Sequence, residues 1–275
     1  MFHMKNTFTS KTLVCSAIAA AGFALSATNA RSAAVFTETA GDSFYDSGWS
    51  GGSSQPANFG WFLATTTTDP GFAGHFMGDS TTLAGESGGG DINTVGRSWG
   101  MFAGSGGSGF GQSDAYGFLK DGSGNDAALS LGQTLSLDLA VNFRNGYKGV
   151  AMRDAGGAEL FTFNIGGDDY QVLNATTGSG SIGSDYNANT VFHVAVTQTS
   201  AGGGTWEITR SGGISDYDTG TYSGLIANFK LYVGQTDGGD ANNLMVNNVS
   251  VVPEPGAAGL LLIGSGLLLF RRNRR

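Results

Sequence analysis

The chain has 275 residues and a formal net charge of −8 at pH 7, from 22 acidic and 14 basic residues. The charge is unevenly distributed, because residues 35–252 contain 21 of the acidic residues but only seven of the basic ones. A domain this acidic repels nucleic acid and anionic lipid at long range, so we exclude both as partners. The only cysteine, Cys15, lies in the N-terminal apolar segment, which excludes a disulfide-stabilised fold for the rest of the chain.

The N-terminus has the three-part pattern of a secretory signal peptide. Two lysines precede the uncharged apolar run 13–25, and small residues follow it. Signal peptidase cuts after Ala30 and after Ala34 both fit the pattern. We favour the cut after Ala34, which gives a signal of residues 1–34, because strand-like residues follow it at once. The sequence therefore predicts export from the cytoplasm.

Residues 35–252 have the composition of one all-β domain. Glycine supplies 42 of these 218 residues and proline only two, while Ser, Thr, Asn and Asp are frequent. This composition is typical of short strands joined by glycine-rich turns. The aromatic residues provide the buried area that a core needs. We predict an antiparallel β-sandwich or jelly roll, flanked by an N-terminal signal helix and a C-terminal transmembrane helix.

Strands are predicted along the whole domain. The clearest is 134–143, where five apolar residues alternate with polar ones, and Asn145-Gly146 behind it is a strong hairpin signal. With the segments 147–153, 158–165 and 170–173 it predicts a four-stranded meander. The other predicted strands are 59–67, 74–77, 98–103, 115–120, 191–197, 205–210, 225–234 and 244–252.

Three segments of the domain resemble bacterial surface sandwiches of the concanavalin and laminin-G-like type. They are RSWGMFAGSGG (97–107), LGQTLSLDLAVNF (131–143) and NNLMVNNVSVV (242–252). The resemblance is one of pattern and order. It implies a two-sheet sandwich displayed outside the cell.

The domain lacks the sequence patterns of common hydrolases. A serine hydrolase needs a serine on a strained turn with His and Asp behind it, and no such motif occurs. Sandwich-type glucanases place their carboxylates in an E-x-D-x-x-E run on one strand, which is also missing. Of the two histidines in the domain, His193 alternates with apolar neighbours and is predicted on the wet side of a strand. We predict a protein that is not an enzyme, with a glycoside hydrolase as the less favoured alternative.

Two Asp/Asn-rich loops are candidate calcium sites. They offer oxygen ligands in the sequences DGSGND and DGGDAN, without the full EF-hand pattern. The same residues are also ordinary turn chemistry. The candidate ligands are Asp121, Ser123, Asn125 and Asp126 in the first loop, and Asp237, Asp240 and Asn242 in the second.

Tryptophans that are exposed on a sandwich can stack on sugar rings. Trp49 lies in the polar stretch DSGWSGGSS and is the one we expect to be exposed, as a candidate for glycan stacking. Trp206 alternates with Ile208 and is predicted in the core.

The C-terminus combines three features in a fixed order. Pro253-Glu254-Pro255 is followed by the uncharged segment 256–270, about 22 Å long as a helix, and then by a basic cluster. The positive-inside rule keeps that cluster cytoplasmic and the domain on the far side of the membrane. The cluster consists of Arg271, Arg272, Arg274 and Arg275.

This order of features in residues 253–275 closely resembles the PEP-CTERM sorting signal. The resemblance implies a Gram-negative bacterium that makes extracellular polysaccharide, a short stay in the inner membrane, and recognition of the tail by the membrane peptidase exosortase. We therefore predict an exported cell-surface or matrix protein with a structural or adhesive role. The alternative is a carbohydrate-binding sandwich module for exopolysaccharide, assisted by calcium if either loop binds it.

Overall fold

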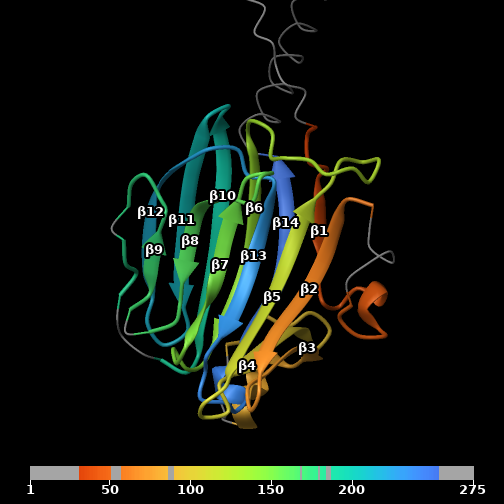
Figure 1. Ribbon diagram of the computed structural model, residues 1–275. Helices are drawn as coiled ribbons and strands as arrows, with labels where there is room; N and C mark the ends of the chain where they lie inside the picture. The colour runs from red at the N-terminus through yellow and green to blue at the C-terminus, as the bar shows by residue number, and fades with distance from the viewer. Residues whose placement is uncertain are drawn as a thin grey trace, which may run out of the picture. The chain divides into compact units, whose positions relative to one another are not determined.

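The computed structural model describes residues 31–50, 57–85, 90–167, 169–178, 180–183 and 187–253. They form two antiparallel β-sheets that face each other (Figure 1). Three short 3₁₀ helices accompany the strands, η1 (Ser43–Tyr45), η2 (Ser80–Gly85) and η3 (Asp240–Asn242). The strands are β1 (Phe36–Glu38), β2 (Phe59–Thr68), β3 (Phe72–Gly78), β4 (Ser98–Gly104), β5 (Phe110–Leu119), β6 (Gln133–Val141), β7 (Tyr147–Arg153), β8 (Glu159–Asn164), β9 (Gln171–Leu173), β10 (Thr190–Ser200), β11 (Gly203–Ser211), β12 (Asp216–Ser223), β13 (Asn228–Gly234) and β14 (Leu244–Pro253).

One sheet has eight strands and the other has six. The eight-stranded sheet runs β12-β11-β10-β6-β14-β4-β3, with β1 paired to the second half of β14. The six-stranded sheet runs β2-β5-β13-β7-β8-β9 and lies toward the viewer in Figure 1. Sequence neighbours often lie in different sheets, so the chain crosses repeatedly between the two layers. The predicted all-β sandwich is confirmed for the described residues.

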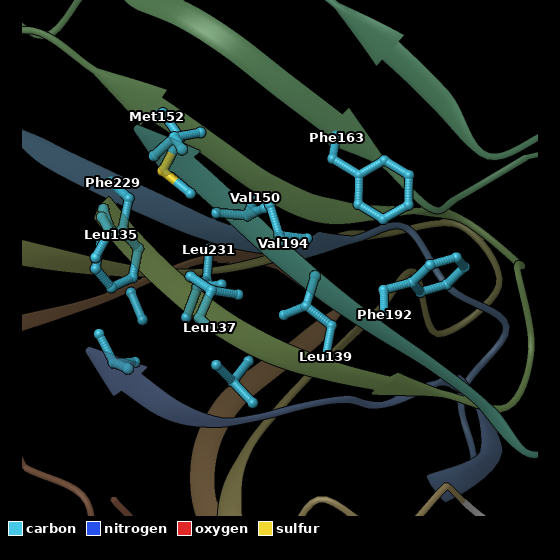
Figure 2. Close-up of a cluster of buried hydrophobic side chains, with 14 of the residues drawn as sticks. Leu135, Leu137, Leu139, Val150, Met152, Phe163, Phe192, Val194, Phe229 and Leu231 are labelled. Atoms are coloured by element: carbon cyan, nitrogen blue, oxygen red, sulfur yellow. The ribbon is translucent and has the colours of Figure 1, made fainter. Parts of the chain in front are cut away.

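The core lies between the two sheets and is built by period-two alternation. Leu135, Leu137 and Leu139 of β6 are fully buried, and they face Val150 and Leu231 of the opposite sheet (Figure 2). Each large apolar side chain that is fully buried stabilises the fold by about 1.5–3 kcal/mol. Trp206 is buried as predicted, and His193 is exposed on the outer side of β10 as predicted.

The predicted hairpin at Asn145-Gly146 is wrong. Strand β6 pairs with β10 and β14 in the eight-stranded sheet, whereas β7 belongs to the six-stranded sheet. Strand β6 ends at Val141, and residues 142–146 are long enough to cross the roughly 10 Å between packed sheets. The Asn145 side chain exchanges two hydrogen bonds with Asp237, which holds the crossover in place. The meander is confirmed only for its last three strands, β7, β8 and β9.

Residues 31–34, which the sequence analysis assigned to the signal peptide, belong to the folded domain. Ala33 is 3% exposed, and its backbone N–H donates to the Ala128 carbonyl at 2.8 Å. At the other end of the domain, β14 is hydrogen-bonded on both sides and ends at Pro253. No helix in the described part of the chain is long and apolar enough to cross a membrane.

Candidate functional site

The outer face of the six-stranded sheet has a floor of small residues between larger side chains. The register aligns Gly149 of β7 with Tyr232 of β13, and Ala151 with Lys230. Gly234 of β13 lies directly beneath the ring of Tyr147, since a Cβ atom at position 234 would lie 2.2 Å from that ring. The small floor leaves room above the sheet while long side chains stand around it.

These side chains border an open hollow of about 270 Å³. Its walls come from strands β5, β7, β8, β9 and β13. It is lined by Gln112, Tyr147, Glu159, Thr162, Leu173, Asn174, Lys230 and Tyr232.

Two tyrosines form the aromatic part of the hollow. The rings of Tyr147 and Tyr232 are 6.4 Å apart and inclined by 34°. The Tyr147 hydroxyl donates to Gln112 Oε1 at 3.2 Å, and the Tyr232 hydroxyl donates to Asn164 Oδ1 at 3.1 Å. Burial raises the pKa of both phenols, so both stay protonated at neutral pH. Each hydroxyl is held in place by an amide and keeps its lone pairs for another donor.

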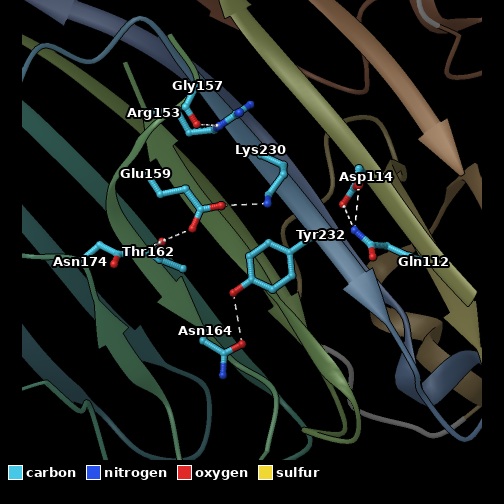
Figure 3. A network of polar contacts seen from close by, with 10 residues as sticks. All are labelled: Gln112, Asp114, Arg153, Gly157, Glu159, Thr162, Asn164, Asn174, Lys230 and Tyr232. Carbon is cyan, nitrogen blue, oxygen red and sulfur yellow. Dashed lines mark hydrogen bonds and ion pairs between the residues drawn. The ribbon is translucent and has the colours of Figure 1, made fainter. Parts of the chain in front are cut away.

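An ion pair forms the charged part of the hollow. Lys230 Nζ lies 2.8 Å from Glu159 Oε1, and the second oxygen of Glu159 accepts a hydrogen bond from Thr162 (Figure 3). Asn174 in turn donates to the Thr162 hydroxyl at 3.1 Å. Partial burial raises the pKa of Glu159, but the hydrogen bond and charge of Lys230 outweigh it and hold the pKa below its usual value.

A second carboxylate lies beside the hollow on β5. Both oxygens of Asp114 accept hydrogen bonds from Gln112 Nε2, at 3.0 and 2.9 Å. Gln112 therefore connects Asp114 with the Tyr147 hydroxyl. Further along the face, Arg153 stacks 5.3 Å above the Tyr116 ring and donates to the Gly157 carbonyl.

The hollow combines aromatic surface with fixed donors and acceptors. Lys230 and Asn174 have N–H groups beyond those used in the network, and the tyrosine and carboxylate oxygens have free lone pairs. A ligand whose groups both donate and accept hydrogen bonds matches this set. Hydroxyl groups do so.

The structure contradicts the expected exposure of Trp49. Its side chain is only 7% exposed, and its ring packs edge-on against Trp61 at 5.1 Å and His75 at 5.4 Å. Residues 46–50 are placed so that the indole enters the aromatic core, because burying so large a ring is strongly favourable. Trp49 is therefore not a surface for glycan stacking.

The first candidate calcium loop is closed by its own hydrogen bonds. The Asp121 carboxylate accepts the backbone N–H groups of Ser123 and Asn125 at 2.8 and 3.0 Å, and also the Asn125 amide. These bonds lower the pKa of Asp121. Asp126 pairs with Lys120 at 2.8 Å. The loop has the geometry of an Asx turn.

The second candidate loop is held by a buried lysine. Lys148 Nζ is fully buried and donates to the carbonyls of Asn242 and Phe143, at 2.7 and 2.8 Å. Asp237 pairs with Asn145, and Asp240 is exposed at the start of η3. Burial lowers the pKa of Lys148 to about 7. The described residues contain no group of three or more His, Cys, Asp or Glu side chains that could hold a metal ion.

The candidate sorting motif is only partly visible. Pro253 is the exposed last residue of β14. Glu254, Pro255 and the four C-terminal arginines lie outside the described residues, as do the expected signal and transmembrane helices.

Sequence reasoning missed all the residues that line the hollow. The alternation in FGQSDAYGFL puts Gln112, Asp114 and Tyr116 on one side of β5, although the predicted strand begins only at residue 115. Lys230 and Tyr232 alternate in the same way. The signal was therefore present strand by strand, but the pairing that brings these strands together is not readable from the sequence.

Comparisons with known proteins give only remote structural similarities. No protein-family model and no curated protein sequence matches the chain. The alginate lyase AlgAT5 of polysaccharide lyase family 7 is 16% identical, with a TM-score of 0.38 over 59% of this chain and 80% of that chain. The ligand-binding domain of botulinum neurotoxin serotype D, solved with N-acetylneuraminic acid, is 11% identical, with a TM-score of 0.28 over 70% of this chain and 43% of that chain. A β-1,2-glucanase from Parabacteroides distasonis is 13% identical, with a TM-score of 0.28 over 70% of this chain and 23% of that chain.

Proposed function

We propose that the protein binds carbohydrate in the hollow on the outer face of the six-stranded sheet. One observation carries this proposal: two aromatic rings and a set of mutually hydrogen-bonded polar groups line the same cavity of about 270 Å³. Ligand sites combine apolar surface with a few well-placed polar groups in this way.

The chemistry of the hollow favours a sugar over other small ligands. A pyranose ring has an apolar face of C–H bonds, which packs on an aromatic ring, and hydroxyls that both donate and accept. The hollow offers the rings of Tyr147 and Tyr232 for the first purpose. It offers Lys230, Glu159 and Asn174 for the second. The side chains hold one another in place, so little ordering is needed when a ligand binds.

We propose binding without turnover at this site. A glycosidase needs one carboxylic acid whose pKa is raised, so that it can protonate the leaving oxygen. At Glu159 the pKa is lowered instead, by its bond to Lys230. The pKa of Glu38 is raised by burial, but Glu38 lies on β1, in the other sheet.

Binding to a panel of polysaccharides tests the proposal. We expect the protein to bind at least one glycan, and Tyr232→Ala to weaken this binding at least tenfold, about 1.4 kcal/mol. Tyr217→Ala is the matched control, because Tyr217 is 54% exposed on β12 of the other sheet. Circular dichroism checks that each variant is folded. If Tyr232→Ala does not fold, Tyr232→Phe, which retains the ring and removes the hydroxyl, takes its place.

The outcome is decisive in both directions. Loss of binding in Tyr232→Ala but not in Tyr217→Ala supports the proposal. Absence of binding to every glycan, or equal loss in both variants, contradicts it. Product release from any glycan would assign an enzyme in place of a binding protein.

We further propose that the protein is exported and acts as an adhesive component of the cell surface or extracellular matrix. The PEP-CTERM resemblance of residues 253–275 supports this, and a carbohydrate-binding face suits a polysaccharide matrix. Strand β14 ends at Pro253, which is the first residue of the sorting motif. The intact mass of the protein recovered from its host tests the processing: loss of residues 256–275 is expected, and a retained tail contradicts it.

A further inference from the structure

The two most exposed large apolar side chains of the six-stranded sheet lie at opposite ends of one cross-strand row. Phe62 on the edge strand β2 is 57% exposed, and Leu173 on the edge strand β9 is 46% exposed. The register connects them through every strand between, in the order Phe62, Tyr116, Lys230, Ala151, Thr162 and Leu173. The row spans five strand spacings, about 24 Å at about 4.8 Å each.

We propose that this row is the track of one uncharged polysaccharide chain, laid across the strands from Leu173 to Phe62. This inference rests on the proposed carbohydrate site and extends it. The hollow occupies the Leu173 side of the row, and it does not include Tyr116 or Phe62. The rings of Phe62 and Tyr116, 5.9 Å apart, provide a second aromatic platform beyond it. A ligand that reaches both ends must be several sugar units long.

The charges along the row favour a neutral chain. Lys230 is paired with Glu159 at 2.8 Å, and Arg153 is engaged by the Gly157 carbonyl and the Tyr116 ring. Asp114 adds a further negative charge beside the hollow. A uronate carboxylate would meet the carboxylates of Glu159 and Asp114, while the cations Lys230 and Arg153 are both already engaged by groups of the protein, within a strongly acidic domain. A neutral hexose or pentose chain has no such repulsion.

Affinities for a chain-length series test the inference. The probes are neutral disaccharides and hexasaccharides of the polysaccharide class that the panel identifies, with oligouronates of equal length as the charged comparison. We expect the hexasaccharide to bind at least tenfold more tightly than the disaccharide. In Phe62→Ala this advantage should fall several-fold, with disaccharide binding unchanged. Phe44→Ala is the control, because Phe44 is also exposed but lies in η1 and is not part of the row.

The outcomes separate this inference from the proposed function. Equal affinity for both lengths, with binding still lost in Tyr232→Ala, keeps the carbohydrate site and overturns the extended track. Tighter binding of oligouronates overturns the assignment of a neutral chain. Absence of any glycan binding overturns both proposals.

A separate observation bears on maturation. Four residues assigned to the signal peptide are fastened to the domain: the Ala34 N–H donates to the Lys120 carbonyl at 2.8 Å, and the carbonyl of Arg31 accepts from Ala128 at 2.9 Å. The buried side chain of Gln133 donates to the Ala33 carbonyl at 2.8 Å. Removing these residues would leave buried polar groups without partners, which is costly.

We infer that signal peptidase cuts after Ala30 and that the mature chain begins at Arg31. This rests on the proposed signal peptide and not on the carbohydrate site. N-terminal sequencing of the exported protein tests it: a start at Arg31 is expected, and a start at Val35 contradicts it. Ala30→Trp should block maturation, whereas Ala34→Trp should leave the cut in place. An unprocessed wild-type N-terminus would contradict the signal peptide itself.

Discussion

The two outer faces of the sandwich follow the same period-two rule but differ in use. On the eight-stranded sheet, short side chains pair across neighbouring strands, as Thr134 does with Thr197 at 2.7 Å and Ser136 with Ser250 at 3.0 Å. Part of that face is covered by Ile92, which packs with Ala140 and Met245. The six-stranded sheet instead has long aromatic and charged side chains around a small-residue floor, and this floor leaves a hollow. The face that can bind a ligand is therefore distinguished by long side chains next to glycines. The alternation of residues along the strands is the same on both faces.

Glycines beneath aromatic rings occur on both faces and allow a matched experiment. Gly234 lies under Tyr147 on the six-stranded sheet, and Gly100 lies under Phe76 on the eight-stranded sheet. A Cβ atom would come within 2.2 and 2.3 Å of the respective ring, so alanine must displace the ring in both cases. We expect Gly234→Ala and Gly100→Ala each to lower the free energy of unfolding by about 1–3 kcal/mol.

Only one of the two substitutions should affect binding. Displacing Tyr147 disturbs the hollow, so Gly234→Ala should weaken glycan binding at least tenfold. Gly100→Ala should leave the affinity unchanged. Urea unfolding measures the loss of stability, and titration with the glycan measures the loss of affinity. Equal losses of affinity in both variants would mean that binding weakens because the fold is destabilised, and not because the hollow is disturbed.

Much of this fold could be predicted from the sequence, because alternation and turn chemistry are local. The strand residues of β6 and β10 and the burial of Trp206 follow from period two alone. The site could not be predicted, because it depends on which strands pair. The Asn145-Gly146 signal led to a wrong pairing, since the same dipeptide also serves a crossover between sheets. The predicted exposure of Trp49 was wrong for a related reason: an aromatic residue with polar sequence neighbours can still be buried by tertiary contacts.

Two basic side chains extend the comparison to pH dependence. Lys148, behind the six-stranded sheet, is fully buried, and burial lowers its pKa from 10.5 to about 7. The unfolded chain therefore binds more protons than the folded one between these values, and stability rises with pH. We expect the free energy of unfolding to gain about 2 kcal/mol from this group between pH 7 and pH 9.

Lys148→Met isolates this contribution. Urea unfolding of the variant is measured at pH 7, 8 and 9. Between pH 7 and pH 9 its free energy of unfolding should rise by about 2 kcal/mol less than that of the wild type. Phenol ionisation is avoided by staying below pH 10. An unchanged slope would mean that the ammonium, held by the carbonyls of Phe143 and Asn242, remains charged in the folded protein throughout this range.

The threonine pair on the eight-stranded sheet should matter little. Thr134 and Thr197 are partly buried, and water can replace the hydroxyl that either one loses. We expect Thr134→Val to change the free energy of unfolding by less than about 1 kcal/mol, as cross-strand pairs do. Its glycan affinity should equal that of the wild type. A binding defect in this variant would indicate that the ligand binds the eight-stranded sheet, which contradicts our proposal.

The smallest expected effect comes from His193, the counterpart of Lys148 on the eight-stranded sheet. Its Nδ1 lies 2.7 Å from Asp138 Oδ1, and this hydrogen bond raises the pKa of His193 despite partial burial. Because the folded pKa is raised, the stabilisation is fully present below about pH 6.5 and is lost as the pH rises through the folded value. The imidazole is half-exposed, so we expect less than about 1 kcal/mol. NMR titration of the imidazole should give a pKa above 6.5 in the wild type and a lower one in Asp138→Asn. Equal values would mean that the pair is not formed in solution. The pH slopes from His193 and Lys148 have opposite signs, since a carboxylate faces the first cation and only carbonyls face the second.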